Sequence, residues 1–295
     1  MGFQLPPFSV VLLATTALVA GSAYVGWQHR EMPGTVPFVV FMLFVALWSG
    51  TYGVQLLFTS LGAQLFWDNV QYPGGLLTPI SFFVFALYYT GREHYLTRTR
   101  LAALGAIPVL TSLAVWIPGA RALVRVEARM ASVGPYAVAH IDHGPLFDIS
   151  VIYSYLVVVA GLGLLIYTTF QARELYRKQT ALVTLSAVVP VAGSVVTYVL
   201  DLTIIDYTPV GMAVFGVVFA VALTRYQLLD VYPVPRNQIL QHVDKGIIAT
   251  DPEGRIIDIN PAAAELLRVE GVVGRRLADI DAPQADDNAA LADGA

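Results

Sequence analysis

The residues best suited to chemistry lie close together in the stretch HIDHGPLFD, which contains His140, Asp142 and His143. Two imidazoles and a carboxylate are groups that bind zinc or copper in proteins. A solvated loop bracketed by glycine and proline explains the same residues without a metal, and we favour that interpretation. We therefore predict no metal site, with these three residues as the candidates to check.

Other common catalytic groups are missing from the sequence. The chain has no cysteine, which excludes disulfides, thiolate metal ligands and cysteine nucleophiles. It contains neither H-E-x-x-H nor G-x-S-x-G, the signatures of metalloproteases and serine hydrolases. Its two lysines, Lys178 and Lys245, lie outside the apolar stretches, so neither can form a retinal Schiff base there. The sequence thus predicts no catalytic residue and no cofactor.

The elements that must position any site are strongly apolar. Of the 295 residues, 56% are hydrophobic and only 13% are charged, and the mean hydropathy is +0.65. Seven stretches carry no Asp, Glu, Lys or Arg: residues 8–27, 36–58, 74–91, 101–117, 149–170, 180–200 and 207–224. As helices they would reach roughly 26 to 35 Å, which brackets the hydrocarbon core of a bilayer. We predict an all-α membrane bundle of seven transmembrane helices.

The basic residues predict the orientation of this bundle, because cytoplasmic loops retain Lys and Arg near the ends of spans. With the N-terminus outside, eight basic residues lie on the inner side: Arg30, Arg92, Arg98, Arg100, Arg173, Arg177, Lys178 and Arg225. The outer side has only Arg121, Arg125 and Arg129, in the long loop 118–148. We expect the N-terminus outside the plasma membrane, the C-terminus in the cytoplasm, and a short amphipathic helix over 121–130.

The predicted spans contain no ionisable group at depth, which argues against a pump or coupled transporter. The nearest acids, Asp68, Asp201 and Asp206, lie at the outer ends of spans. Prolines and glycines within the spans are compatible with a polar and aromatic ligand pocket that opens to the outside, although packing alone explains each residue. The candidates are Trp48, Thr51, Gln55, Trp67, Thr78, Tyr153, Tyr155 and Tyr198.

A soluble part of different character follows the last span. Residues 230–295 hold 6 basic and 12 acidic residues, so they lack the basic patch that nucleic-acid binding requires. Two β-branched runs, 246–250 and 255–259, flank a turn with Asp251 and Gly254, which predicts a hairpin. Asn260 then precedes a proline and AAAELL, which predicts a helix capped by the asparagine side chain.

The hairpin, the Asn-Pro helix and a following G-x-x-G-R-x-L segment resemble the start of a PAS sensory domain, an α+β fold. The resemblance makes Gly246, Asp251, Gly254 and Asn260 the motif residues of this segment. We expect a partial PAS domain at 243–280 and an acidic, disordered tail at 281–295. Residues 226–242 would form a linker with a short helix, after a seven-helix domain at 1–225.

Residues 1–245 resemble the N-terminal seven-helix region of archaeal and bacterial sensor histidine kinases. The likeness rests on seven spans, a long external fourth loop, FALYYTGR at the end of the third span, and RYQLLDVYPVPR before the PAS start. It implies a membrane receptor for an external or intramembrane stimulus, a homodimer, and a response regulator reached through a kinase core. No phosphoacceptor motif or ATP lid of that core occurs in this sequence. The alternative is a transporter or channel with a regulatory cytoplasmic domain.

Overall fold

The computed structural model describes residues 2–32, 34–171, 174–195, 206–226, 246–251, 253–267, 269, 271–272 and 274–279. The chain divides into two units, residues 1–230 and 231–295, and each is described by itself. The predicted tail 281–295 and nearly all of the predicted linker 226–242 lie outside the described residues.

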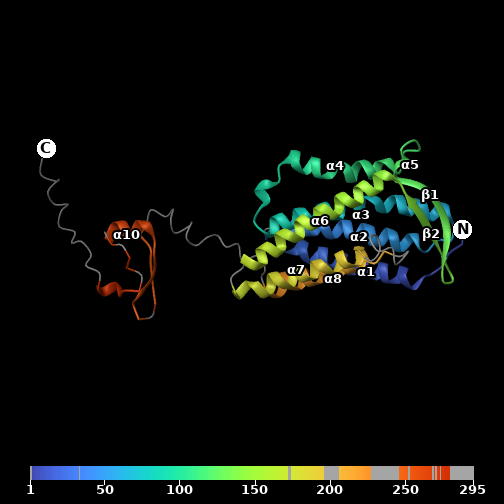
Figure 1. Ribbon diagram of the computed structural model, residues 1–295. Coiled ribbons are helices and arrows are strands. Elements are labelled where there is room, and N and C mark those ends of the chain that lie inside the picture. The colour runs from blue at the N-terminus through green and yellow to red at the C-terminus, as the bar shows by residue number, and fades with distance from the viewer. Residues whose placement is uncertain are drawn as a thin grey trace. The chain divides into compact units, whose positions relative to one another are not determined.

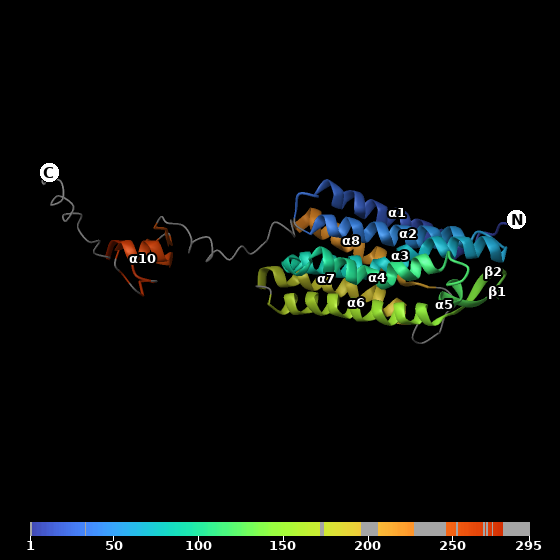
Figure 2. The ribbon, with the colours of Figure 1, turned by 90° about the horizontal axis from the view of Figure 1, so that it is seen from above.

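A bundle of helices forms the first unit (Figure 1, Figure 2). Each of the seven predicted segments coincides with a helix in the described part of the chain: α1 (Pro7–Gln28), α2 (Thr35–Gln55), α3 (Leu61–Tyr89), α4 (Arg98–Ala114), α6 (Pro145–Gln171), α7 (Glu174–Ser194) and α8 (Thr208–Tyr226). Helices α1, α2, α3 and α6 are long and apolar enough to cross a membrane, and α7 and α8 contain shorter apolar stretches. The unit is therefore a mostly helical membrane protein.

Helix α3 begins thirteen residues before the predicted span, at Leu61 instead of Gly74. The predicted span excludes Asp68 because it was limited to a charge-free apolar stretch. Within the bundle, Asp68 and Asn69 are both buried and hydrogen-bonded to a common arginine, Arg125. These tertiary partners allow polar residues to occupy the buried face of a long helix.

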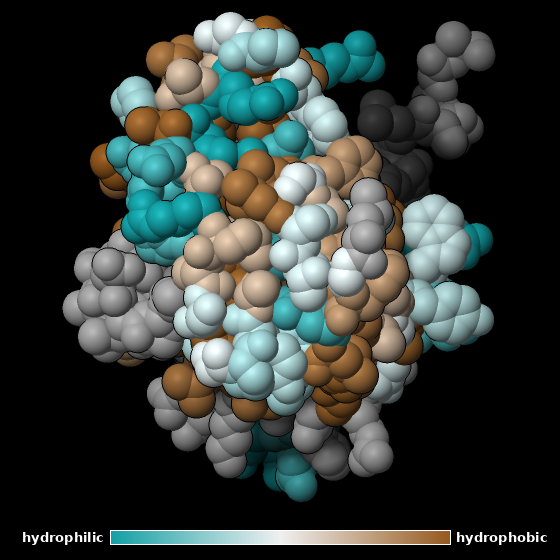
Figure 3. Space-filling model, turned by 90° about the vertical axis from the view of Figure 1, so that its right-hand side faces the viewer, coloured by the Kyte–Doolittle hydropathy of each residue, from teal (hydrophilic) through white to brown (hydrophobic). Residues whose placement is uncertain are grey.

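The loop between α4 and α6 differs from the expected helix, because most of it forms β-strands. The first unit is therefore not all-α. Only α5 (Arg121–Val124) is a helix, and the chain continues as two antiparallel strands, β1 (Arg125–Val133) and β2 (Tyr136–His143). The segment predicted as an amphipathic helix over 121–130 therefore becomes a strand after Val124. Gly134, with φ of 60°, makes the tight turn that lets Val133 pair with Tyr136. This hairpin lies at the end of the bundle that carries the N-terminus, shown end-on in Figure 3.

Two glycines let helices approach closely. A Cβ at Gly74 of α3 would lie 2.6 Å from the backbone nitrogen of Trp48 in α2, and a Cβ at Gly211 of α8 would lie 2.7 Å from Cα of Pro190 in α7. Both separations are too short for a real side chain, so these crossings require glycine. The α2–α3 and α7–α8 pairs are consequently in backbone contact.

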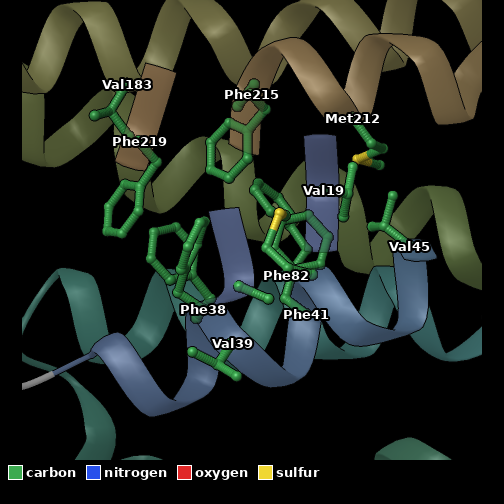
Figure 4. Close-up of a cluster of buried hydrophobic side chains, with 14 of the residues drawn as sticks. Val19, Phe38, Val39, Phe41, Val45, Phe82, Val183, Met212, Phe215 and Phe219 are labelled. Atoms are coloured by element: carbon green, nitrogen blue, oxygen red, sulfur yellow. The ribbon is translucent and has the colours of Figure 1, made fainter. Parts of the chain in front are cut away.

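A cluster of phenylalanines fills the core between α2, α3 and α8 (Figure 4). Its six members are Phe38, Phe41, Phe82, Phe85, Phe215 and Phe219. The ring centroids of Phe38 and Phe219 are 4.3 Å apart, and those of Phe85 and Phe219 are 4.9 Å apart. Such contacts add dispersion and quadrupole attraction to packing. These ring contacts pack α8 against α2 and α3, the two helices that share the most extensive contact in the described bundle.

The described part of the second unit holds strands β3 (Ile248–Thr250) and β4 (Ile256–Ile259), helix α10 (Pro261–Leu267) and the short 3-10 helix η3 (Leu277–Asp279). The strands pair antiparallel, as the hairpin prediction required. The backbones of Arg276 and Arg255, which lies just before β4, form an isolated antiparallel β-bridge. The segment after α10 therefore returns to the hairpin.

The four predicted PAS motif residues have structural roles in this unit. Asn260 Oδ1 accepts hydrogen bonds from Ala263 N at 2.9 Å, which confirms the predicted helix cap, and from Ile247 N at 2.8 Å. Asp251 Oδ1 accepts from Arg255 N at 2.7 Å, and Gly254 has φ of 78° in the connecting turn. Gly246 packs on α10, where an added Cβ would lie 3.1 Å from Cα of Ala263.

Candidate functional site

A cavity of about 400 Å³ lies inside the first unit. Its wall combines elements that are far apart in the sequence: Trp48 from α2, Gly75 from α3, His140 from β2, Ser154 from α6, Pro190 from α7 and Met212 from α8. Its volume falls in the range of cavities that bind small molecules in proteins. Five helices and the hairpin therefore contribute to one open cavity in the described part of the bundle.

A buried ion pair supports the hairpin side of the cavity. Arg125, the first residue of β1, donates from Nη2 to Asp68 Oδ2 and, at 2.8 Å, to Asn69 Oδ1. The Arg125 and Asp68 side chains are only 5% and 8% exposed. Since a buried charge is tolerated when it is paired and hydrogen-bonded, each group stabilises the other. The pair fixes the start of the hairpin on α3.

A second branch of hydrogen bonds runs from Asp68 along the cavity wall. Gln71 Nε2 donates to Asp68 Oδ1 at 2.8 Å and to Gln55 Oε1 at 3.1 Å, which joins α3 to α2. Gln71 Oε1 is buried but accepts no hydrogen bond. An amide oxygen can only accept, so this atom needs a donor from another molecule.

The Ser154 hydroxyl of α6 is also buried without a hydrogen-bond partner, whereas the Tyr72 hydroxyl of α3 interacts with the Arg125 side chain. Tyr72 is 5% exposed, and its ring packs edge-on against Phe147 of α6. Buried polar atoms in folded proteins are nearly always satisfied, by protein or by bound molecules. Two residues that line the cavity, Gln71 of α3 and Ser154 of α6, therefore carry a buried polar atom whose missing partner a ligand or water would supply.

Two glutamine side chains hold β2 over the bundle. Gln64 of α3 is fully buried; its Nε2 donates to Ala137 O at 2.8 Å and its Oε1 accepts from Ala139 N at 2.6 Å. Gln4 donates to Ala137 O at 2.7 Å and accepts from Ala137 N at 2.9 Å. Both amides thus bind the edge of β2 that faces away from β1, and they position Ala139 and His140 at the cavity.

The opposite wall contains the first turn of α8. Asp206 Oδ1 accepts hydrogen bonds from Thr208 N at 2.9 Å and from Thr208 Oγ1 at 2.6 Å, and Asp206 N donates to the Tyr52 hydroxyl at 3.3 Å. On the α6–α7 side, the hydroxyls of Tyr155 and Ser194 are 2.7 Å apart. These bonds connect the last helix of the bundle to the cavity.

The structure brings only some of the predicted pocket residues together. Trp48, Gln55, Thr78 and Tyr155 line the cavity. Thr51 instead bonds its hydroxyl to Leu47 O of its own helix at 2.6 Å, and Trp67 packs edge-on against Phe66. Tyr153 lines a separate cavity toward the other end of the bundle and donates to Leu104 O at 2.8 Å. Tyr198 lies outside the described residues.

The three metal candidates have different neighbours. His140 Nε2 is 3.4 Å from Asp142 Oδ1, and Asp142 Oδ2 accepts from Arg129 at 2.8 Å. The His143 ring instead stacks on Phe147, with centroids 3.6 Å apart. Among the residues that the structure describes, no group of three or more His, Asp or Glu side chains is arranged to bind a metal.

Burial lowers the pKa of His143 to about 4, although the nearby Asp148 and Asp142 carboxylates act in the opposite direction. Arg125 and His140 reinforce the decrease through charge repulsion. At neutral pH the imidazole is therefore uncharged, which suits its stacking on an apolar ring.

Sequence reasoning missed Gln71, Tyr72, Ser154 and Arg125. Asp68 was read as a loop boundary, and Arg125 as part of an amphipathic helix. One available signal was the helical spacing of Asp68, Gln71 and Tyr72, which places them on one side of a helix next to a charge-free span. Ser154 carries no comparable signal, because serine is common within apolar membrane helices.

Two family models match the chain. One, described as the N-terminal 7TM region of histidine kinase, matches residues 11–233. The other, a PAS domain, matches residues 237–294. This second match includes nearly all of the stretch that composition predicts as a disordered tail. Neither the curated proteins nor the solved structures include a significant match to this chain.

Proposed function

The chain belongs to the family of N-terminal seven-transmembrane regions of histidine kinases, and on this premise we propose that residues 1–225 bind a stimulus and control a PAS domain. A histidine-kinase-type sensor module is embedded in a membrane and acts on a response regulator. The finer proposal concerns the stimulus site, the route of the signal and the topology.

One observation carries the proposal of a stimulus site. The cavity wall includes Thr208 and Met212 of α8, the last helix before the linker, together with residues of α2, α3, α6 and α7. A molecule in this cavity would contact α8 directly. A ligand shifts a conformational equilibrium only if it binds the two states with different affinity, and contact with a helix that moves supplies such a difference. Trp48, Gln55, Thr78 and Tyr155 are the predicted candidates that belong to this site.

The route of the signal follows α8. Met212 at the cavity is followed one turn later by Phe215 and then by Phe219, both members of the phenylalanine cluster. A displacement of Met212 would therefore be passed to the cluster and along α8 toward the linker 226–242. The linker would transmit it to the PAS domain, proposed at 243–280 from its motif residues.

A double electron–electron resonance experiment tests this route without a known stimulus. Leu101→Cys on α4 and Val221→Cys on α8 are exposed positions, and the chain has no other cysteine to label. Gly75→Leu would fill the cavity, because a Cβ at Gly75 makes only ordinary contacts with the Trp48 ring. We expect the spin-label distance to change with Gly75→Leu and not with Gly163→Leu, whose Cβ meets nothing within 4 Å. Identical spin-label distances in the labelled chain, in its Gly75→Leu variant and in its Gly163→Leu variant would contradict the proposed route.

The topology is proposed as seven spans with the N-terminus outside. Helix α6 supports membrane embedding, because Ile149, Ile152, Leu156 and Val159 form an exposed apolar stripe at helical spacing. The hairpin end would face outward, and the end with Arg92 and Arg98 would face the cytoplasm.

Labelling of single cysteines with a membrane-impermeant maleimide in intact cells tests the orientation. Glu127→Cys on the hairpin and His94→Cys at the other end are both exposed positions. We expect modification of the first and not of the second. The reverse result would overturn the proposed orientation. A homodimer, as in sensor kinases generally, is proposed from the family alone.

A further inference from the structure

We infer that the cavity binds a small, neutral, largely apolar molecule that carries a hydrogen-bond donor such as a hydroxyl or an amide N–H. The inference rests on the proposed function and names the class of ligand for the same site. It is argued from three properties of the wall: its apolar area, its unsatisfied atoms and its charge balance.

Most of the wall requires an apolar partner. The side chains of Trp48, Leu76, Pro79, Phe147, Val158 and Met212 contribute rings and aliphatic groups from both sides of the cavity. Burying apolar ligand surface against such groups contributes roughly 25 cal/mol per Å². The main part of the ligand is therefore a ring system or a short hydrocarbon.

The unsatisfied atoms require a donor on that apolar body. Gln71 Oε1 can only accept, and its amide nitrogen is already used by Asp68 and Gln55. Its orientation is thus fixed by two bonds, and its unpaired oxygen is a buried atom of a residue that lines the cavity. The Ser154 hydroxyl can donate or accept, so it accommodates a ligand hydroxyl or amide in either direction.

The charges on the wall favour a neutral ligand. Asp68 is neutralised by Arg125 and accepts from Gln71 through its other oxygen. Asp206 accepts two hydrogen bonds from Thr208 at the start of α8, where the helix dipole favours a carboxylate. His143 is uncharged at neutral pH. An anionic ligand would lie beside two carboxylates, and a cationic ligand would compete with Arg125 for Asp68 and with Thr208 for Asp206, so burying either charge is costly.

Four naphthalenes that differ in one substituent test the inference. The probes are 2-naphthol, 2-methoxynaphthalene, 2-naphthoate and 2-naphthylmethylammonium, and binding to the full chain in nanodiscs is measured with protein-free nanodiscs subtracted. We expect saturable binding of 2-naphthol. The methyl ether, which lacks the donor, should bind about tenfold more weakly, because a buried acceptor is left unsatisfied. The two charged probes should bind more weakly still.

Three substitutions locate that binding. Gln71→Met should remove the difference between naphthol and its methyl ether, a result that a purely structural effect would not produce. Ser154→Ala removes a hydroxyl that makes no bond in the protein, so it should weaken naphthol binding with the fold intact. Gly75→Leu should abolish binding of every probe while the thermal stability is retained. Gln171→Met, on the exposed end of α6, is the matched control and should change nothing.

Equal affinity for naphthol and its methyl ether, or tighter binding of a charged probe, would overturn the assignment of ligand class. So would naphthol binding that survives Gly75→Leu. The first two results leave the spin-label experiment on α8 unaffected, because that experiment uses no ligand, so the failure of the ligand class is distinguishable from the failure of the proposed function.

Discussion

Arg125 and Asp68 form an ion pair between the first residue of the β-hairpin and a buried turn of α3, 57 positions earlier in the chain. The pair joins the β-hairpin to the bundle where the polar wall of the cavity begins. Its burial has measurable consequences for stability.

Arg125→Ala should destabilise the first unit by about 3 to 5 kcal/mol, because it leaves the Asp68 carboxylate buried without its partner. Arg129→Ala is the matched control on the same strand. Its pair with Asp142 is roughly half exposed, so its loss should cost about 1 kcal/mol or less. Thermal unfolding in detergent measures both variants. Equal losses for the two arginines would show that the buried pair contributes nothing specific.

Gln64→Leu should detach β2 from α3. The substitution removes a buried amide and leaves Ala139 N without its bond, at about 1 to 3 kcal/mol, while Ala137 O keeps the bond from Gln4. We expect faster hydrogen exchange at the Ala139 amide, measured by mass spectrometry. Gln171→Leu, at the other end of the bundle, should leave this exchange rate unchanged. Unchanged protection in the Gln64 variant would mean that the hairpin is held by other contacts.

The stability of the first unit should depend on pH through His143. Its pKa is about 4 in the folded chain and about 6.5 when unfolded, so the unfolded state binds more protons between these values. Stability is therefore expected to fall as the pH decreases from about 6.5 to about 4, and this contribution to the pH dependence should disappear in His143→Gln. His94→Gln is the control. A melting temperature that depends on pH equally in both variants would refute this assignment.

Asn260→Ala should loosen the second unit, because Asn260 Oδ1 accepts from both Ile247 N and Ala263 N. Loss of a helix cap costs about 0.5 to 2 kcal/mol. Asn260→Asp retains an acceptor and should preserve most of the stability. Hydrogen exchange at the two amides in the full chain distinguishes these variants. The control is Asp258→Ala, an exposed residue whose carboxylate bonds only the next amide among the described contacts.

The sequence predicted the helices better than it predicted the site. Charge-free apolar runs located the seven helices because membrane helices satisfy their backbone bonds within one segment. The hairpin was missed, since its strands are only eight and nine residues long and their pairing depends on Gln4 and Gln64, which are distant in sequence. The asparagine cap in the second unit was predicted because its donors lie within the adjacent turn.

The cavity was predicted only in part for a related reason. Trp48 and Gln55 stand out as polar or large residues within an apolar span. The Asp68 and Arg125 partnership depends on a tertiary contact between α3 and β1, which no local pattern encodes. Tyr153 lies only one residue from Ser154, yet it lines a different cavity, because neighbouring residues on a helix point about 100° apart.

In the proposed signal route, the contact between Gly211 and Pro190 would be the point about which α8 tilts. Gly211 lies in the first turn of the helix, next to the cavity residues Thr208 and Met212, and the helix continues to Tyr226. The two backbones are in contact at Gly211. The part of α8 before this contact lies at the cavity, and the part from Gly211 to Tyr226 is about 22 Å long. If α8 tilted by about 5° about the Gly211–Pro190 contact, its end at Tyr226 would move by roughly 2 Å. A small expansion of the cavity would thereby be enlarged at the end from which the chain leaves the bundle.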